Sequence, residues 1–374
     1  MTLLARPLGL VLLLACGRTS DPNTILVGQY GSFTGSEATF GLSGKNGIAL
    51  AVREINAAGG IKGKQVRVNA LDTGGRSQEA GLAVTRLITE DKVVAVLGEA
   101  SSNLSLAGGR VAQRYGVPMV SPSSTAPEVT EVGDMIFRVC FIDSFQGYVG
   151  ARFVHDDLKL ARAAVLYDQA EPYSQGLKDV FEKELVRIGG EIVVETSYTH
   201  GDADYSAQLT SIRDRKPDII YLPGYYTDVG NIILQARKLG IVQPFLGGDG
   251  WDSAQLAKIA GAAVEGSYFS THYSHQDRNA AVQAFVRKYR DAYGEVPDVV
   301  GALGYDAAMV LADAMRRAPS LSGRDIARAL AETRDFAGVT GTISIDAHRN
   351  ARKAAVILVM KDGQPTYVTS IPPP

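Results

Sequence analysis

A short loop rich in hydroxyl groups is the first stretch of this sequence that could do chemistry. Ser123, Ser124 and Thr125 follow an apolar run at 117–120, and Pro127 comes shortly after them. A strand that ends in such a loop presents N–H and O–H groups at its carboxyl end, where open α/β sheets bind small ligands. No general base stands beside these hydroxyls in the sequence, so the pattern indicates binding rather than catalysis. The alternative is that the hydroxyls only form turns or cap a helix.

Other candidate sites have less support from the sequence. His272 and His275 form an H-x-x-H pair, but no Cys or carboxylate cluster stands at ligand spacing beside it, so we predict no metal site. Gly41, Gly44 and Gly47 have the wrong spacing for a dinucleotide-binding fingerprint. The sequence contains no G-x-S-x-G motif and no P-loop lysine motif. We therefore expect no cofactor and no enzymatic activity, and an enzyme on a Rossmann-like scaffold is the disfavoured alternative.

The elements that must position the loop alternate between strand and helix. Apolar runs predict strands at 24–30, 65–71, 93–97, 117–120, 163–167, 191–196, 218–222 and 244–246. The segments between them carry apolar residues at helical spacing, as Ile48, Ala51, Val52 and Ile55 do. This alternation predicts an α/β protein with parallel sheets, and two such series in tandem predict two similar lobes. From residue 280 the pattern becomes helical, and short antiparallel strands are expected at 341–345, 355–361 and 367–370.

Length and charge agree with this picture. The 374 residues exceed one ordinary core, which favours two lobes. Lys and Arg together number 38 against 40 Asp and Glu, and the formal net charge is −2. Because the sequence has no basic stripe, nucleic acid is not an expected partner.

The N-terminal segment has the features of an export signal. Arg6 precedes an apolar run at 8–15, which is too short to span a bilayer but suits a signal peptide. The run ends in Leu-Leu-Ala-Cys-Gly at 13–17, which resembles the lipobox of bacterial lipoproteins. This implies a signal peptide at 1–15, a lipidated Cys16 that anchors the protein to a membrane, and a tether at 16–23. The alternative is an ordinary signal peptide with an incidental cysteine. With Cys16 used for the lipid, Cys140 has no partner and is expected to be a small buried hydrophobic residue.

Several segments together resemble the type I periplasmic binding proteins, specifically the leucine/isoleucine/valine-binding group that serves branched-chain amino acid ABC transporters. The segments are 31–35 with Phe40 and Gly41, 55–61 (INAAGGI), 121–130 (SPSSTAPEVT), Asp168 with 173–176 (YSQG), 247–252 (GGDGWD) and 304–306 (GYD). The resemblance implies two Rossmann-like lobes with three hinge crossings. The N-terminal lobe would hold 24–142 and 274–336, and the C-terminal lobe 143–273 and 337–374.

The resemblance also implies an amino-acid site between the lobes. Hydroxyl groups at Ser102 and in the Ser123-Ser124-Thr125 loop would bind the carboxylate, which O–H donors and helix N-terminal N–H groups can satisfy without a buried cation. Asp249 and the Ser123 carbonyl would accept the ammonium. Asp249 stands where the leucine-binding proteins have Glu, so its side chain is one methylene shorter.

Aromatic residues would form the walls of this site. Phe40, Tyr173 and Tyr225 match the positions that line the pocket in the family, and Tyr226 and Trp251 are neighbours that could contribute. Glu99 would repel a ligand carboxylate if it faced the cleft, so we expect it to point away or to meet an Arg.

These observations predict an extracytoplasmic, lipid-anchored and monomeric substrate-binding protein. It would capture an amino acid, with an aliphatic or branched side chain favoured, and deliver it to the permease of an ABC importer. The alternative is a binding component for amides, urea or aromatic carboxylates. A ligand that lacks an ammonium would make Asp249 dispensable, which distinguishes the two hypotheses.

Overall fold

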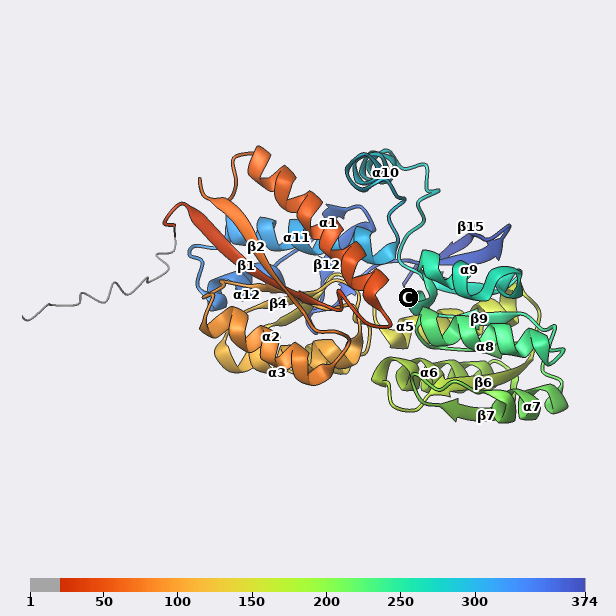
Figure 1. Ribbon diagram of the computed structural model, residues 1–374. Helices are drawn as coiled ribbons and strands as arrows, with labels where there is room; N and C mark the ends of the chain where they lie inside the picture. The colour runs from red at the N-terminus through yellow and green to blue at the C-terminus, as the bar shows by residue number, and fades with distance from the viewer. Residues whose placement is uncertain (1–20, 374) are drawn as a thin grey trace, which may run out of the picture.

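Residues 21–373 form two α/β lobes in the computed structural model (Figure 1). The first lobe contains a five-stranded parallel sheet in the order β2-β1-β3-β4-β5. Its strands are β1 (Thr24–Gly31), β2 (Gln65–Asp72), β3 (Val96–Leu97), β4 (Met119–Ser121) and β5 (Ile136–Arg138). Val27, Leu97 and Val120 on these strands are buried, as expected for a parallel sheet that helices cover on both faces.

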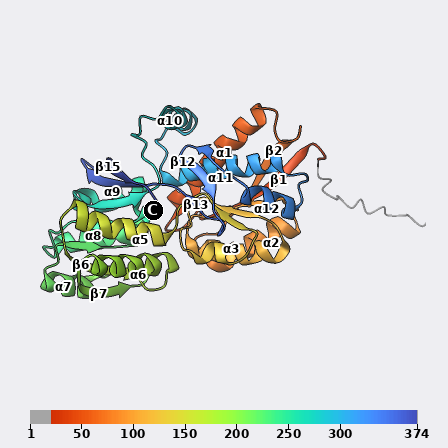
Figure 2. The ribbon, with the colours of Figure 1, turned by 180° about the vertical axis from the view of Figure 1, so that it is seen from behind.

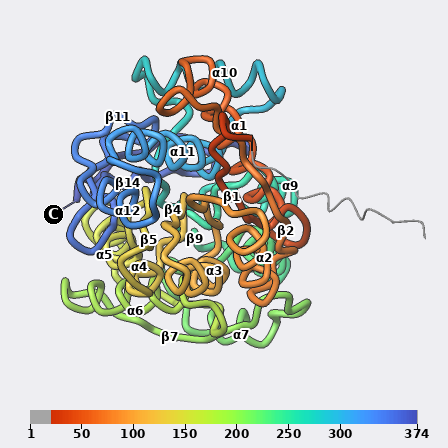
Figure 3. Tube along the Cα trace, turned by 90° about the vertical axis from the view of Figure 1, so that its left-hand side faces the viewer, coloured from red at the N-terminus to blue at the C-terminus, as the bar shows by residue number. Residues whose placement is uncertain are grey.

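Helices enclose this sheet from two sides, as Figures 1 and 3 show from different directions. On one side lie α1 (Ala38–Ala57) and α11 (Val299–Arg317), and on the other lie α2 (Ser77–Thr89) and α3 (Ser102–Tyr115). The lobe also contains α4 (Glu128–Glu131), α10 (Ala280–Tyr293) and α12 (Gly323–Ala331). Close contact between α1 and α11 depends on glycine, because a Cβ on Gly47 would lie 2.0 Å from the carbonyl oxygen of Gly301.

The second lobe is built around a seven-stranded sheet in the order β15-β14-β10-β9-β8-β6-β7. The parallel strands are β6 (Arg162–Asp168), β7 (Glu191–Tyr198), β8 (Ile219–Tyr221), β9 (Phe245–Gly247) and β10 (Tyr268–Thr271). Two antiparallel strands, β14 (Ala355–Lys361) and β15 (Gln364–Ile371), extend its edge. Its helices are α5 (Asp143–Arg152), continued by the π-helix η1 (Phe153–Asp157), α6 (Pro172–Arg187), α7 (Ser206–Arg215), α8 (Tyr226–Lys238) and α9 (Ala254–Ala260), followed by the 3-10 helix η3 (Gly261–Val264). Figures 1 and 2 show α8 and α9 on one face of this sheet and α5 and α6 on the other.

The chain passes between the lobes three times: between β5 and α5, between β10 and α10, and between β13 (Ala351–Arg352) and β14. The α/β architecture, the two lobes and the three crossings agree with the fold predicted from the sequence.

The last crossing lies later in the chain than expected. The sequence places 337–374 in the C-terminal lobe, but β11 (Phe336–Gly338), β12 (Gly341–Ile345) and β13 form a small separate sheet. This sheet is tied to the first lobe, since the carboxylate of Asp306 on α11 accepts the N–H groups of Val339 and Thr340, and Ile345 N–H donates to the Thr333 carbonyl. Residues 337–352 therefore belong with the first lobe. The sequence did not predict this, because a run of short antiparallel strands does not reveal which helix each strand packs against.

The expected signal peptide at 1–15 and the lipidated Cys16 lie outside the residues that the structure describes, as does most of the expected tether. Within residues 21–373, no helix is both long and apolar enough to cross a membrane.

Candidate functional site

A cavity lies between the lobes, among the loops that follow β3, β4, β8 and β9. This location at the carboxyl ends of strands is where open α/β sheets bind ligands. Seven of the eight side chains expected to bind ligand line it, and Ser124 does not. The lining residues are Phe40, Ala100, Ser102, Ser123, Thr125, Tyr173, Tyr225, Asp249, Gly250, Val299 and Val300.

The first-lobe side of the cavity presents hydroxyl groups that have no partner. Ser123 Oγ and Thr125 Oγ1 are buried and make no hydrogen bond with any group of residues 21–373. Ser102, the first residue of α3, accepts a hydrogen bond from Ala126 N–H at its Oγ, and its own N–H faces the Tyr225 hydroxyl at 3.3 Å. A buried polar group without a partner costs about 1–3 kcal/mol, so these two hydroxyls are placed to gain from a polar ligand.

Ser124 has a different role from the one the sequence predicted. Its hydroxyl contacts the carbonyls of Glu99 and Ala100 at 3.0 and 2.9 Å and Ser105 Oγ at 2.7 Å. Side chains of neighbouring residues in an extended segment point to opposite sides, so Ser124 turns away from the cavity that Ser123 and Thr125 line. Ser124 therefore fixes the loop to the end of β3 instead of facing a ligand.

Arg138 also holds this loop, and sequence reasoning missed it. The side chain is fully buried at the end of β5, and Nη1 donates to the Ser124 carbonyl at 2.7 Å while Nη2 donates to the Ala126 carbonyl at 2.8 Å. Nη2 also reaches the carbonyl of Pro127 and Thr130 Oγ1, both at 3.2 Å. An arginine inside an apolar strand is the signal that could have identified it, because a buried charge requires partners.

The second-lobe side of the cavity carries one carboxylate. Asp249 begins the 3-10 helix η2 (Asp249–Trp251) directly after β9. Tyr173 Oη donates to Asp249 Oδ1 at 2.9 Å, and His272 Nε2 lies 3.0 Å from Oδ2. Glycine is required beside this carboxylate, since a Cβ on Gly248 would lie 2.4 Å from the Tyr173 hydroxyl. The carboxylate is thus held by two side chains and reaches the cavity opposite the free hydroxyl groups.

Aromatic and aliphatic groups form the rest of the wall. The rings of Tyr173 and Tyr225 stack with centroids 5.1 Å apart, and Phe40 meets Tyr225 edge-on at 6.4 Å. Val299 and Val300, at the start of α11, add an apolar surface that the sequence did not reveal, because such valines are more often core residues.

Two aromatic neighbours named from the sequence, Tyr226 and Trp251, do not line the cavity. Trp251 is buried and donates from Nε1 to the Leu222 carbonyl at 3.0 Å. Tyr226 donates to the Ser36 carbonyl of the first lobe at 2.9 Å. Trp251 therefore packs behind the site, and Tyr226 bonds the two lobes together, but neither side chain forms part of the cavity wall.

Comparison with known proteins decides the family. The profile of the family described as periplasmic binding protein matches residues 24–364. This chain belongs to that family. Curated relatives include Leu/Ile/Val-binding protein homolog 1 of Brucella suis, which is 32% identical over 86% of each chain.

Solved structures of similar proteins support the same assignment. A leucine binding protein, LivK, of Thermotoga maritima is 38% identical, with a TM-score of 0.89 over 93% of this chain and 99% of the other. The substrate binding protein LivJ of a branched-chain amino acid transporter of Streptococcus pneumoniae, determined with isoleucine, is 36% identical, with a TM-score of 0.89 over 94% and 100%. This periplasmic binding protein therefore shares both fold and family with proteins of the branched-chain amino acid group.

Glu99 does not line the cavity of this periplasmic binding protein. It is buried, and its Oε2 accepts hydrogen bonds from Ser32 Oγ at 3.3 Å and Thr73 Oγ1 at 3.2 Å. Burial raises the pKa of Glu99 to about 7, and its Oε1 accepts the N–H of Ala100. The carboxyl group points away from the cavity, as one of the two expectations from the sequence had it, and no arginine meets it among the described residues.

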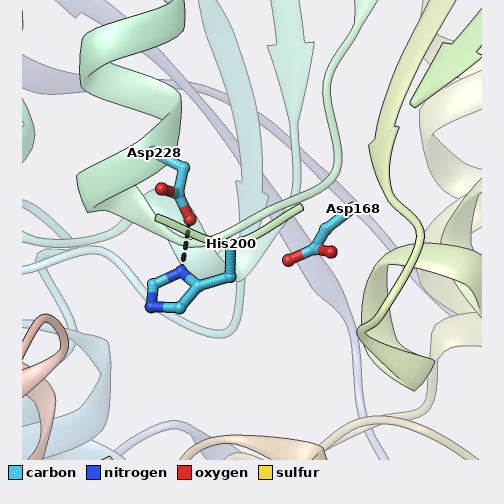
Figure 4. Close-up of side chains that lie close together, drawn as sticks. All are labelled: Asp168, His200 and Asp228. Carbon is cyan, nitrogen blue, oxygen red and sulfur yellow. Dashed lines mark hydrogen bonds and ion pairs between the residues drawn. The ribbon is translucent and has the colours of Figure 1, made fainter. Parts of the chain in front are cut away.

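A polar cluster joins the lobes at the rim of the cleft. Asp168, His200 and Asp228 of the second lobe offer ligand atoms within 4.8 Å of one another, and Figure 4 shows the ring of His200 turned with Nδ1 toward Asp228. Nδ1 lies 2.6 Å from Asp228 Oδ2, and Nε2 lies 3.1 Å from Ser36 Oγ across the cleft. The hydrogen bond with Asp228 raises the pKa of His200 to about 9. A protonated His200 explains how these carboxylates can lie close together, because its positive charge offsets their negative charges. Its Nε2 also lies 3.8 Å from Glu37 Oε1.

Proposed function

We propose that this periplasmic binding protein captures an α-amino acid with an aliphatic side chain between its lobes and delivers it to an ABC importer. The observation that carries the proposal is the pairing of unlike groups across one cavity. Ser123 Oγ and Thr125 Oγ1 lack partners on one side, and the Asp249 carboxylate stands on the other. A zwitterion supplies what each side needs: acceptor oxygens for the hydroxyl groups and an ammonium for the carboxylate.

An aliphatic side chain suits the remaining surface. Phe40, Val299 and Val300 carry no polar side-chain group, and the stacked rings of Tyr173 and Tyr225 present apolar faces. A hydrophobic wall of this kind stabilises an apolar side chain at about 25 cal/mol per Å² of buried area. The names of the relatives support the same ligand class.

The finer localisation is also a proposal. Export followed by lipidation of Cys16 would hold the protein on the outer side of a membrane, near the permease that it serves. A monomer is sufficient for this role, because both halves of the cavity come from one chain. A solute-binding role needs no catalytic group, and we propose that this protein has no enzymatic activity.

The first test is isothermal titration calorimetry of the purified protein with the common amino acids, benzoate, acetamide and urea. We expect leucine, isoleucine or valine to bind and the non-zwitterionic compounds not to bind. Tight binding of an amide or an aromatic acid, with no amino-acid binder, would reject the ligand class proposed here.

The second test is Asp249→Ala. We expect amino-acid affinity to fall at least about 100-fold, because removing one partner of a buried ion pair costs about 3–5 kcal/mol. Asp214→Ala, at a carboxylate that is 67% exposed, is the matched control and should leave affinity unchanged. An Asp249→Ala variant that binds as the native protein does would remove Asp249 from the site.

A further inference from the structure

One buried histidine connects the cavity carboxylate to the hinge. His272 directly follows β10, where the chain leaves the second lobe on its second crossing. Its side chain is 0% exposed, and Nε2 lies 3.0 Å from Asp249 Oδ2. The ring stacks on Phe141, in the segment of the first crossing, with centroids 3.6 Å apart and planes 27° apart. His272 therefore touches two of the three connections between lobes and the one carboxylate that lines the cavity.

The protonation state of His272 follows from its surroundings. Burial lowers its pKa, and the positive charge of Lys353 acts in the same direction, whereas Asp249 opposes them. Nδ1 is buried and has no hydrogen-bond partner in the described part of the chain, so a proton on Nδ1 would be unsatisfied. In the neutral ring with its hydrogen on Nε2, this N–H donates to Asp249 Oδ2, and Nδ1 carries no proton that would lack an acceptor.

The neighbouring acid does not compete with Asp249. Asp143, at the start of α5, is fully buried, and neither of its carboxyl oxygens has a hydrogen-bond partner between residues 21 and 373. Burial and, after it, the charge of Asp249 raise the pKa of Asp143 well above its ordinary value. Burial also raises the pKa of the Cys140 thiol to about 12, so this group stays neutral. Of these three acidic groups, Asp249 is the one that His272 contacts.

We propose that His272 is a positioning residue for ammonium recognition. The neutral imidazole donates a hydrogen bond to Asp249 and holds that carboxylate toward the cavity, and the negative charge of Asp249 stays available to the ligand. This inference rests on the proposed amino-acid-binding function. A protonated His272 would instead form an ion pair with Asp249 and compete with the ligand ammonium. Selectivity for α-amino acids at neutral pH then depends on an uncharged imidazole behind the carboxylate.

Calorimetry on His272→Phe and His272→Gln tests the proposal, with L-leucine and 4-methylpentanoate, which is leucine without its ammonium, as probes. Phe keeps a ring against Phe141 but cannot donate, so leucine affinity should fall about 10- to 100-fold, the value of a hydrogen bond to a charged group. Affinity for 4-methylpentanoate should change less than about twofold, because that ligand does not use Asp249. Gln keeps an N–H donor and should retain most of the leucine affinity.

The pH profile separates positioning from simple packing. Because the pKa of His272 is lowered, native affinity for leucine should stay constant from pH 8 to pH 6.5 and fall only below pH 6.5, as His272 gains a proton. The fall should be much smaller in His272→Gln, which cannot titrate. His275→Phe and His275→Gln are matched controls three residues along the chain, at a partly buried histidine outside the cavity. Both should behave as the native protein.

Three outcomes would overturn the inference. They are an equal loss of leucine and 4-methylpentanoate affinity in His272→Phe, a pH profile that His272→Gln leaves unchanged, and leucine binding that neither His272 variant changes. If His272→Phe does not fold, the Gln profile alone decides. A native protein that binds no amino acid would instead reject the proposed function itself, whereas normal leucine binding by the native protein with no effect of either His272 variant rejects only this inference.

Discussion

Replacing Arg138 with Met should loosen the loop that carries Ser123 and Thr125. The two shortest bonds of the guanidinium, to the carbonyls of Ser124 and Ala126, are hydrogen bonds from a charged donor, worth about 1.5–3 kcal/mol each. Met carries no charge, so the variant avoids the free-energy cost of burying one, and this offsets part of the stability lost with the two hydrogen bonds. We therefore expect the free energy of unfolding to fall by about 2–4 kcal/mol.

Arg138→Met should also weaken leucine binding by the variant molecules that remain folded. Arg138 bonds to loop carbonyls rather than to the cavity, so its loss acts on the ligand only through the position of the loop. Leucine affinity of the folded variant should fall about tenfold, which corresponds to about 1.4 kcal/mol. Arg138→Lys should lie between Met and the native protein, because Lys keeps the charge but lacks the planar fork of donors.

Urea unfolding and calorimetry on the same preparations give both quantities. Arg110→Met, at an exposed arginine on α3, is the matched control and should change neither. An Arg138→Met variant with native stability would refute this reasoning and show that the contacts of Ser124 suffice to hold the loop. A variant that is destabilised but binds leucine with native affinity would show that Arg138 supports the fold and not the site.

Three further predictions concern stability, each measured by urea unfolding. Gly47→Ala should destabilise by about 3 kcal/mol or more, because its Cβ meets the backbone of α11, whereas Gly81→Ala, with open space around it on α2, should stabilise by about 0.5–1 kcal/mol. Burial raises the pKa of Glu99 to about 7, so its contribution to the free energy of unfolding is complete below pH 4.5 and is lost as the pH rises through 7. Glu99→Gln should flatten this dependence of stability on pH. The raised pKa of His200, about 9, gives the same sign: its contribution is complete below pH 6.5 and is lost as the pH rises through 9, and His200→Asn should remove that loss. A pH profile that either variant leaves unchanged would contradict the prediction for that residue.

Much of the fold was predictable, because strand and helix periodicity is a local property of the sequence. The alternation of apolar runs and amphipathic segments indicated the two parallel sheets, and the loop after β4 was identified by its residue types alone. The placement of 337–352 was not predictable, since the bonds that tie this segment to the first lobe end on Asp306 and Thr333, which lie outside the strands themselves.

The site was predictable only in part, for a related reason. Ser123, Ser124 and Thr125 have the same chemistry in the sequence, and only the backbone direction separates the two that line the cavity from the one that anchors the loop. Arg138 and His272 act through contacts with other segments, so their roles appear only once the chain is folded. A charged side chain within the apolar run at 136–141 is the signal that could have pointed to Arg138, whereas the polar sequence around His272 offered no such signal.

The contacts around the cavity show how a ligand could control closure. Each half of the cavity is assembled within one lobe: Arg138 and Ser124 hold the hydroxyl loop, and Tyr173 holds Asp249. Direct bonds also cross the cleft, at its rim between Ser36 and His200 and inside the cavity between Ser102 N–H and the Tyr225 hydroxyl. These bonds leave the hydroxyl groups of Ser123 and Thr125 without a partner among residues 21–373. An amino acid that satisfies the hydroxyl groups on one side and Asp249 on the other supplies the missing interaction, so closure and recognition depend on the same two ends of the ligand.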